Sequence, residues 1–171
     1  MRRIFLDMDG VLTKWEHSSI EQVASRGYFI HRQPQKNVTD AVTILSKTKD
    51  INLYILSSVF MDDHSINEKV EWNRIHVPDI PIERQIFVPY GMSKEAGLDM
   101  IGGIKKDDVL LDDFSENLHK WGGVGIKLYN GINGTKGTWT GYSVHASMKP
   151  EFLARQIAAI AMYSDLKEEM V

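Results

Sequence analysis

The chain alternates between short apolar segments and longer segments in which apolar residues recur at helical spacing. The short segments are rich in Ile, Val, Leu, Phe and Tyr and end at polar residues or turns: residues 3–6, 52–56, 85–88, 109–111 and 124–128. Helical spacing occurs in residues 38–46, 64–75, 93–101, 115–121 and 151 to about 162. Strands that alternate with helices are typical of a parallel sheet, and nearly continuous apolar strands indicate that both sheet faces are covered. The pattern predicts a layered α/β fold with about five parallel strands.

Other segments add local detail to this outline. Polar residues that stand at the start of predicted helices are candidate helix caps: Asn37, Ser93, and Asp62 or Asp63. Residues 131–141, a stretch of Gly, Asn and Thr, are predicted to form a hairpin-like loop. Residues 13–36 do not fit the alternation of strands and helices, so we expect a small cap inserted after the first strand.

The composition limits the class of protein. A length of 171 residues predicts one domain over residues 1–171, and 43% hydrophobic with 25% charged residues is typical of a globular protein. The absence of cysteine excludes disulfides, zinc-thiolate sites and a thiol nucleophile. We find no signal peptide and no run of transmembrane length, so we expect a cytoplasmic protein without a membrane partner. A net charge of −3 does not suggest a partner among nucleic-acid polymers.

Chemically active residues stand at the ends of the predicted strands, and two lysines follow in the helical segment and loop beyond. In an open α/β sheet, ligands bind beyond the carboxyl ends of the strands. We therefore expect these residues to meet at one edge of the sheet: Asp7, Asp9, Ser57, Ser58, Lys69, Lys94, Asp112 and Asp113.

Each of these residue types has a role in phosphoryl transfer. Clustered carboxylates repel one another, and Mg²⁺ would offset that repulsion and neutralise phosphate oxygens. One carboxylate can attack phosphorus to form an aspartyl-phosphate, and a second can protonate the leaving oxygen and later deprotonate water. The hydroxyls of Ser57 and Ser58 and a lysine ammonium would hold the non-bridging phosphate oxygens. The residues thus predict a magnesium-dependent phosphatase that acts on a small phosphorylated substrate.

These residues resemble the four motifs of the haloacid dehalogenase-like (HAD) superfamily over almost the whole chain. The resemblance rests on Asp7-x-Asp9-Gly10-Val11-Leu12, the apolar strand ending in Ser57, the downstream lysine, and Leu110-Leu111-Asp112-Asp113. It implies a three-layer α/β/α Rossmann-like core. It also implies that Asp7 is the nucleophile and a metal ligand, and that Asp9 is the acid/base and binds Mg²⁺ through its backbone carbonyl. Gly10 permits a sharp turn after the strand.

A more specific resemblance is to the 5'(3')-deoxyribonucleotidase family. It is carried by Tyr28-Phe29 before Pro34, Asn37-Val38-x-x-Ala41-Val42, Lys69-x-x-Trp72, and Gln85-Ile86-Phe87-Val88 with Lys94 after it. The resemblance implies that Lys69 holds the phosphate and that Lys94 makes a second phosphate or substrate contact. It implies that Asp113 binds the metal directly, with Asp112 beside it. The substrate would be a deoxynucleoside monophosphate.

The sequence departs from that family in the cap and near the C-terminus. The insertion is shorter than the family's cap, which supplies the nucleobase pocket, and residues 130–141 have no counterpart. Aromatic cap residues could stack a base or simply pack the cap: Trp15, Tyr28 and Phe29. We expect Trp72 in the core, Trp139 as a candidate to close over the site, and surface positions for His17, His31 and His64.

Three alternative functions stay open at this point. One is a HAD phosphatase for another small phosphorylated metabolite. Another is a receiver-type phospho-acceptor domain, although Ile55-Leu56-Ser57 offers no acceptor where such domains carry one. The last is a catalytically idle binding protein, which the intact set of acids argues against, because clustered carboxylates cost folding energy.

Overall fold

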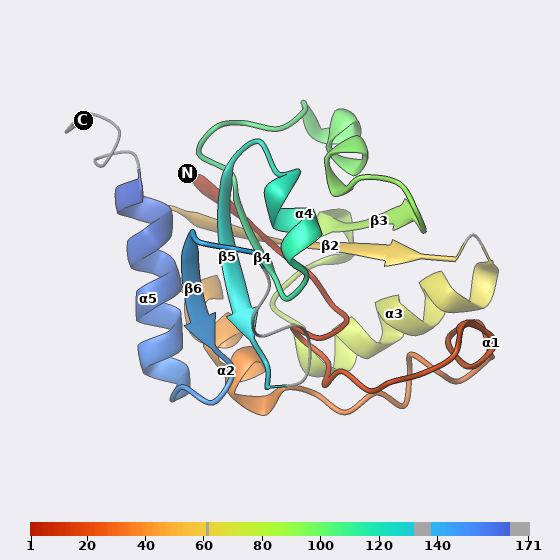
Figure 1. The fold of residues 1–171 in the computed structure, drawn as a ribbon. Coiled ribbons are helices and arrows are strands. Elements are labelled where there is room, and N and C mark those ends of the chain that lie inside the picture. The colour runs from red at the N-terminus through yellow and green to blue at the C-terminus, as the bar shows by residue number, and fades with distance from the viewer. Residues whose placement is uncertain (61, 132–137, 165–171) are drawn as a thin grey trace.

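The central sheet of the protein is parallel throughout (Figure 1). Within residues 1–60, 62–131 and 138–164, which the computed structural model describes, it has six strands in the order β3-β2-β1-β4-β5-β6. The strands are β1 (Arg2–Leu6), β2 (Ile51–Val59), β3 (Gln85–Pro89), β4 (Val109–Asp112), β5 (Val124–Tyr129) and β6 (Tyr142–His145). Five of these coincide with the predicted strands, so the parallel α/β fold is confirmed.

The sixth strand, β6, is the one that the apolar pattern does not predict. Of its four residues only Val144 is buried, so it lies at the sheet edge and lacks the continuous apolar run of the other strands. It pairs in parallel with β5, so these two strands are not the two arms of a hairpin. The hairpin-like loop predicted for residues 131–141 falls mostly on residues 132–137, which lie outside the described part of the chain.

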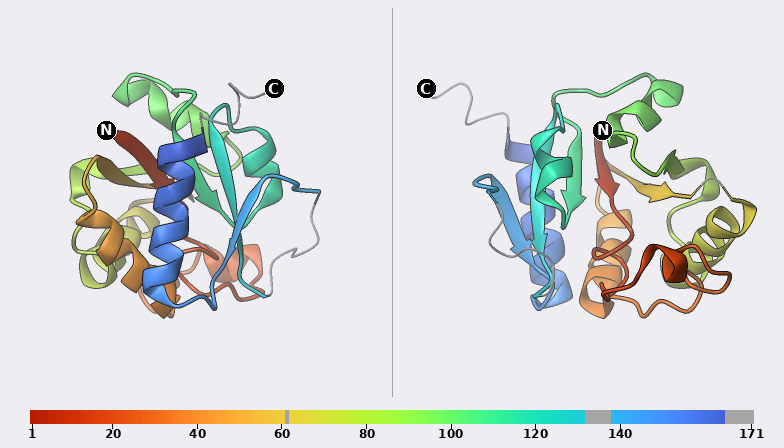
Figure 2. Two further views of the ribbon diagram at one scale, coloured as in Figure 1. Left: turned by 90° about the vertical axis from the view of Figure 1, so that its left-hand side faces the viewer. Right: turned by 45° about the vertical axis from the view of Figure 1, so that its right-hand side comes forward.

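Helices cover both faces of the sheet. They are α1 (Ile20–Val23), α2 (Lys36–Ser46), α3 (Asp63–His76), α4 (Ser115–His119), α5 (Pro150–Tyr163), and the 3-10 helices η1 (Ile82–Arg84) and η2 (Lys94–Ile101). α2 and α5 pack with Ile4 and Leu6 of β1 in one buried cluster, and η2 and α4 pack with Phe5 in another. Alternate side chains of a strand point to opposite faces. The layers are therefore α/β/α, and the left view of Figure 2 shows α5 lying across one face of the sheet.

The predicted helix caps meet different outcomes. Asp62 caps α3, because its carboxylate accepts a hydrogen bond from the Ser65 backbone N–H at 2.7 Å. Asn37 does not cap α2, since the helix begins one residue earlier and the Asn37 amide instead donates to the Ala146 carbonyl at 3.2 Å. Ser93 precedes η2 but makes no side-chain capping bond.

The cap, residues 13–36, crosses from the end of β1 to the start of α2 and carries only the four-residue helix α1. Its two ends are paired, since the N–H of Lys14 donates to the Gln33 carbonyl and that of Gln35 donates to the Leu12 carbonyl. Figure 1 and the right view of Figure 2 show α1 beside α3. The insertion therefore lies next to the helix that carries Lys69.

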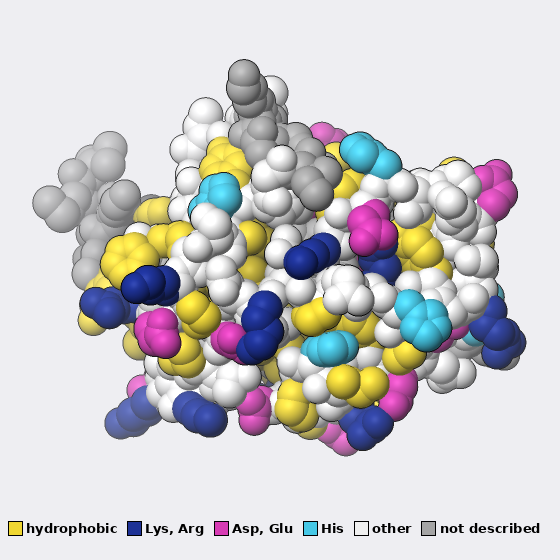
Figure 3. All heavy atoms as spheres, turned by 90° about the horizontal axis from the view of Figure 1, so that it is seen from below, with side chains coloured by type: hydrophobic (Ala, Val, Ile, Leu, Met, Phe, Trp, Pro, Cys, Tyr) yellow, Lys and Arg dark blue, Asp and Glu magenta, His cyan; other side chains and the backbone are white. Residues whose placement is uncertain are grey.

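The surface and the helices add two further observations. The face seen from below in Figure 3 intersperses basic, acidic and hydrophobic side chains, and no single sign of charge dominates it. Among the helices of the described residues, none combines the length and apolarity needed to cross a membrane.

Candidate active site

Three neighbouring strands each bring a polar side chain to the same edge of the sheet. β1 ends at Leu6, so Asp7 is the first residue beyond it, while Ser57 lies late in β2 and Asp112 ends β4. The Asp7 backbone N–H donates to the Leu111 carbonyl at 3.0 Å, which continues the pairing of β1 with β4 past the end of the strand. Because carboxyl ends of parallel strands share one edge, the fold itself brings these residues together.

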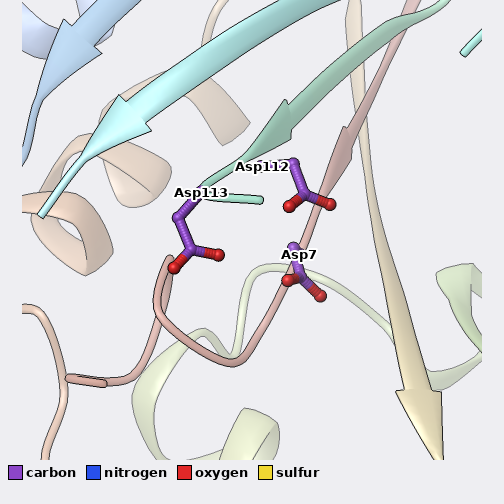
Figure 4. A group of neighbouring side chains, drawn as sticks. All are labelled: Asp7, Asp112 and Asp113. Carbon is purple, nitrogen blue, oxygen red and sulfur yellow. The ribbon is translucent and has the colours of Figure 1, made fainter. Parts of the chain in front are cut away.

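A buried cluster of three carboxylates lies between the ends of β1 and β4 (Figure 4). Asp7, Asp112 and Asp113 each offer an oxygen, and these oxygens lie within 4.8 Å of one another. Gly10 makes room for the third acid: its φ is +85°, and a Cβ there would stand 2.1 Å from Asp113 Oδ2. Glycine is needed at this position both for the backbone conformation and for the close approach of Asp113.

Lys94 neutralises part of this cluster. Its Nζ lies 2.7 Å from Asp7 Oδ1 and 2.7 Å from Asp112 Oδ2, and it donates to the Leu56 carbonyl at 3.1 Å. Burial raises the pKa of Asp7 to about 6, with Lys94 acting against burial and the neighbouring Asp112 and Asp9 reinforcing it. Burial disfavours the Lys94 ammonium, but Asp112 and Asp7 outweigh it and the pKa of Lys94 is raised. Lys94 is therefore a charged ammonium held between two acids.

Lys69 holds Asp9, the second acid of the Asp7-x-Asp9 motif. Its buried Nζ lies 2.5 Å from Asp9 Oδ2 and donates to Ser57 Oγ at 2.9 Å and to the Ser58 carbonyl at 2.8 Å. The ammonium also lies 4.4 Å from the centre of the Phe29 ring in the cap. An ammonium has three N–H donors, and three oxygens here match them. Lys69 thus links the loop after β1, the end of β2 and the cap.

A cavity of about 380 Å³ opens beside these groups, within the size range of small-molecule sites. Its polar lining includes Asp7, Asp9, Lys94, Asp113 and Ser58. Its apolar lining is largely aromatic and comes from the cap, from the end of β2 and from the loops after β3 and β4: Trp15, Tyr28, Phe29, Phe60, Tyr90 and Phe114. The cavity therefore pairs an acidic and basic end with an aromatic end.

Two of the predicted phosphate contacts do not line this cavity. Ser57 and Lys69 are fully buried and are absent from the lining, whereas Ser58 and Lys94 are part of it. Ser57 and Lys69 bind each other instead, at 2.9 Å. The structure thus brings all the predicted site residues to one edge of the sheet but places them in two tiers, one at the cavity wall and one behind it.

The predictions for the tryptophans and histidines have different outcomes. Trp72 is fully buried, as predicted, and its Nε1 donates to the Arg32 carbonyl of the cap at 2.8 Å. Trp139 does not close over the site: it packs against Gly125 of β5 and donates to the Tyr142 carbonyl at 2.9 Å. His17 and His31 are exposed, and His64, near the surface, contacts Asp62 and the Ala24 carbonyl.

Three residues that contact the acids or the cap were not among the residues predicted from the sequence. Asn117 donates to Asp112 Oδ2 at 2.9 Å, and Asn130 donates to Asp113 Oδ2 at 2.9 Å. Glu68 accepts hydrogen bonds from two backbone N–H groups of the cap. Asn130 directly follows β5, so the rule that placed the acids, polar residues just beyond parallel strands, would also have found it. Asn117 and Glu68 lie within helices, where isolated polar residues give no such signal.

The acid cluster could hold a divalent metal ion. Mg²⁺ prefers oxygen ligands and is commonly bound through one or two carboxylates, and this cluster offers three buried carboxylates close together. Asp112 is already occupied: its oxygens accept from the Phe114 backbone, from Asn117 and from Lys94. The donor set therefore fits Mg²⁺ with Asp7 and Asp113 as ligands and Asp112 as their neighbour.

Comparison with known proteins decides the family. The model of the family described as "5' nucleotidase, deoxy (Pyrimidine), cytosolic type C protein" matches residues 19–137, more than half of the chain. The chain belongs to this family. It is therefore a phosphatase of the 5'-nucleotidase type with the HAD fold, and the resemblance drawn from the sequence is confirmed.

The family match covers the motifs around Ser57, Lys69 and Asp112-Asp113 but not the Asp7-x-Asp9 motif. It includes Ser57, Lys69, Lys94 and the acid pair Asp112-Asp113 at the end of β4, whereas Asp7 and Asp9 precede residue 19. Those two acids are tied to the matched part by the ion pairs of Asp7 with Lys94 and of Asp9 with Lys69. No curated protein matches the chain.

Proposed function

We propose that the protein is a Mg²⁺-dependent phosphomonoester hydrolase that works through an aspartyl-phosphate on Asp7. The observation that carries the proposal is the position of Asp7: its carboxylate borders the cavity, lies among Asp112 and Asp113, and contacts the ammonium of Lys94. A nucleophilic carboxylate needs a nearby cation to offset the charge of an incoming phosphate. Lys94 is one such cation, and the acids of the site could bind a second, Mg²⁺.

In this proposal Asp7 is the nucleophile and Asp9 is the general acid and base. In the first step an Asp7 oxygen bonds to phosphorus, the bond from phosphorus to the leaving oxygen breaks, and Asp9 gives that oxygen a proton. In the second step water bonds to phosphorus, its proton passes to Asp9, and the bond from phosphorus to Asp7 breaks to release inorganic phosphate. Asp9 lines the cavity beside Asp7, and its contact with Lys69 at 2.5 Å orients its carboxylate there.

The two lysines have different roles in this proposal. Lys94 lines the cavity and touches Asp7, so a phosphoryl group on Asp7 would lie next to it. Lys69 stands behind the cavity wall and orients Asp9 and Ser57. We therefore assign the main phosphate contact to Lys94, with Ser58 beside it, and make Lys69 a positioning residue. The family resemblance implied a phosphate contact for Lys69 and a second phosphate or substrate contact for Lys94, and this proposal keeps only that of Lys94.

Mg²⁺ would be held by Asp7 and Asp113, with the backbone carbonyl of Asp9 as a further ligand implied by the family. When bound, it would supply positive charge that stabilises the phosphate oxygens in the transition state. The protein's own contribution is the fixed spacing of the acids at the ends of β1 and β4. Asp112 would keep Lys94 and Asn117 in place.

The aromatic end of the cavity supports a nucleotide as substrate. Trp15, Tyr28 and Phe29 of the cap face the same cavity as the acids. Nucleobases stack on aromatic side chains, and the family's description names deoxy and pyrimidine nucleotidase activity. We propose a deoxynucleoside monophosphate as the substrate. The family's description as cytosolic supports a cytoplasmic location.

The test is a phosphatase screen with Mg²⁺ over deoxynucleotides, ribonucleotides, sugar phosphates and phospho-amino acids, with Asp7→Asn as control. The wild type should prefer deoxynucleoside monophosphates, and Asp7→Asn should lose turnover while keeping its circular dichroism spectrum and gaining Tm from the lost repulsion. Full activity of Asp7→Asn would refute the mechanism. A preference for sugar phosphates would keep the mechanism and replace the substrate.

A further inference from the structure

Asn130 joins two parts of the acid site that come from distant points in the sequence. It is the first residue after β5, and its Nδ2 donates to the Gly10 carbonyl at 2.9 Å and to Asp113 Oδ2 at 2.9 Å. Both partners are oxygen acceptors, so the NH₂ end of the amide must face them. One amide therefore connects the loop that follows Asp7 and Asp9 with the acid that follows β4.

The space around this contact is tight. A Cβ at Gly10 would stand 2.1 Å from Asp113 Oδ2, which means that the Asp113 carboxylate lies directly against the Gly10 backbone. Figure 4 shows the same carboxylate beside the loop that follows β1. The Asn130 amide holds this approach from the β5 side. Asp113 also lies among like charges, since its carboxylate and those of Asp7 and Asp112 are close neighbours.

We propose that Asn130 is a positioning residue that holds the Asp113 carboxylate in the orientation needed to bind Mg²⁺. The inference rests on the proposed function. Mg²⁺ demands nearly ideal octahedral geometry, and ligating carboxylates are typically fixed by hydrogen bonds from residues behind them. Without the Asn130 amide, repulsion from the neighbouring acids would favour other orientations of Asp113. Asn130 would then be needed for metal affinity rather than for any proton or phosphoryl transfer.

The experiment compares Asn130→Ala with Asn37→Ala. Asn37 is a matched control, because its amide also makes a long-range hydrogen bond, to the Ala146 carbonyl, but contacts no carboxylate among the residues that the structure describes. MgCl₂ is titrated into each protein without substrate by calorimetry, and the Tm is measured with and without MgCl₂. Asn130→Ala should raise the Kd for Mg²⁺ about tenfold or more, the usual effect of losing such a supporting contact. Its lost activity at limiting Mg²⁺ should return when more Mg²⁺ is added.

The readouts separate positioning from a purely structural role. A structural role would lower the Tm of the metal-free Asn130→Ala protein and leave the Tm gain from Mg²⁺ unchanged, as expected for Asn37→Ala. That result, or an unaltered Kd for Mg²⁺, would overturn the inference. In an Asp113→Asn background, Asn130→Ala should have little further effect on the Kd, because both changes act on one contact.

Should Asn130→Ala fail to fold, Asn130→Ser removes the amide with a smaller loss of volume and is held to the same expectations. A wild type that binds no Mg²⁺ would sink the metal-dependent part of the proposed function, and this inference with it. A wild type that binds Mg²⁺ as well as Asn130→Ala does would sink the inference alone.

Discussion

The acid site and the cap border the same cavity but are built in different ways. Three of the acids, Asp7, Asp112 and Asp113, come from the ends of adjacent strands and are buried, and each lysine of the site has three oxygen partners. The cap has one four-residue helix with no buried residue. It is held to α3 mainly by side chains that bind its backbone: Glu68 to Gly27 and Phe29, His64 to Ala24, and Trp72 to Arg32.

The difference suggests a division between chemistry and recognition. The reacting groups are fixed by strand topology, which a local change in the cap leaves intact. The part of the aromatic wall that the cap supplies depends on a few hydrogen bonds from one helix. Changes in the acid site should therefore affect every substrate, whereas changes in the cap should affect only substrates that carry a base. A suitable pair is a deoxynucleoside monophosphate and 2-deoxyribose 5-phosphate, which lacks the base.

Among the changes that test this comparison, the largest effect is expected from Asp9→Asn. Loss of a general acid/base reduces turnover by about 10²–10⁴, and both members of the substrate pair should lose activity. With p-nitrophenyl phosphate, whose leaving group departs easily, the first step should persist while hydrolysis of the aspartyl-phosphate slows. Rapid-quench or stopped-flow assays should then show a burst of p-nitrophenol of up to one equivalent. Wild-type steady-state rates in this variant would contradict the role of Asp9.

The next effect is expected from Lys94→Met, which leaves Asp7 and Asp112 without their shared cation. Removing one charge of a buried set costs about 3–5 kcal/mol of stability, and losing a transition-state donor costs about 10²–10³ in turnover. Urea unfolding and assays on both substrates measure the two losses. Lys36→Met is the control, because the ion pair of Lys36 with Asp40 is exposed, and exposed pairs contribute about 0–1 kcal/mol. Equal stability of the two variants would show that the Lys94 contacts are dispensable.

The sequence predicts the acid site better than the cap for a physical reason. Parallel strands must carry Asp7 and Asp112 to one edge, so the position of these residues in the chain nearly decides their position in space. Which lysine reaches the cavity is decided by side-chain paths, which the sequence does not reveal; the family resemblance implied phosphate contacts for both Lys69 and Lys94. β6 lies at the sheet edge with one buried residue, so no apolar run marks it.

The contacts of the cap could not be predicted from the sequence in the same way. Glu68 lies 39 and 41 residues from its two partners, and it binds their backbone N–H groups, which every residue but proline presents. No residue type in the cap therefore signals the pairing. The same limit applies to Asn117, whose role depends on the direction of α4 relative to β4.

Glu68→Gln tests the cap side of the comparison. The Glu68 carboxylate accepts from the Gly27 N–H at 2.6 Å and from the Phe29 N–H at 3.1 Å. Glutamine offers one oxygen and would turn an NH₂ toward the other donor, so Tyr28 and Phe29 should lose their fixed position. A hydrogen bond to a charged group contributes about 1.5–3 kcal/mol. We expect kcat/KM for the deoxynucleotide to fall about tenfold, mainly through KM.

The control for this prediction is Glu71→Gln on the same helix. Glu71 pairs with Arg74 at the surface and, within the described part of the chain, makes no hydrogen bond or ion pair with the cap, so both substrates should be processed as by the wild type. In Glu68→Gln, 2-deoxyribose 5-phosphate should keep its wild-type kcat/KM. An equal loss on both substrates would mean that Glu68 acts on the acid site, through its neighbour Lys69, and the division between chemistry and recognition would fail.

The smallest effect is expected from Tyr28→Phe, which removes one hydroxyl from the cavity wall and leaves the ring. The Tyr28 hydroxyl donates to Ser18 Oγ at 3.1 Å, and the Arg32 guanidinium lies 5.1 Å from the ring centre. A single partly exposed hydrogen bond contributes at the low end of about 0.5–1.5 kcal/mol, so KM for the deoxynucleotide should rise about twofold to threefold. The ring that would stack on the base stays in place, so kcat should not change. A much larger rise, confined to the deoxynucleotide, would show that the hydroxyl contacts the base itself, which would give the cap a polar role in recognition beyond its aromatic surface.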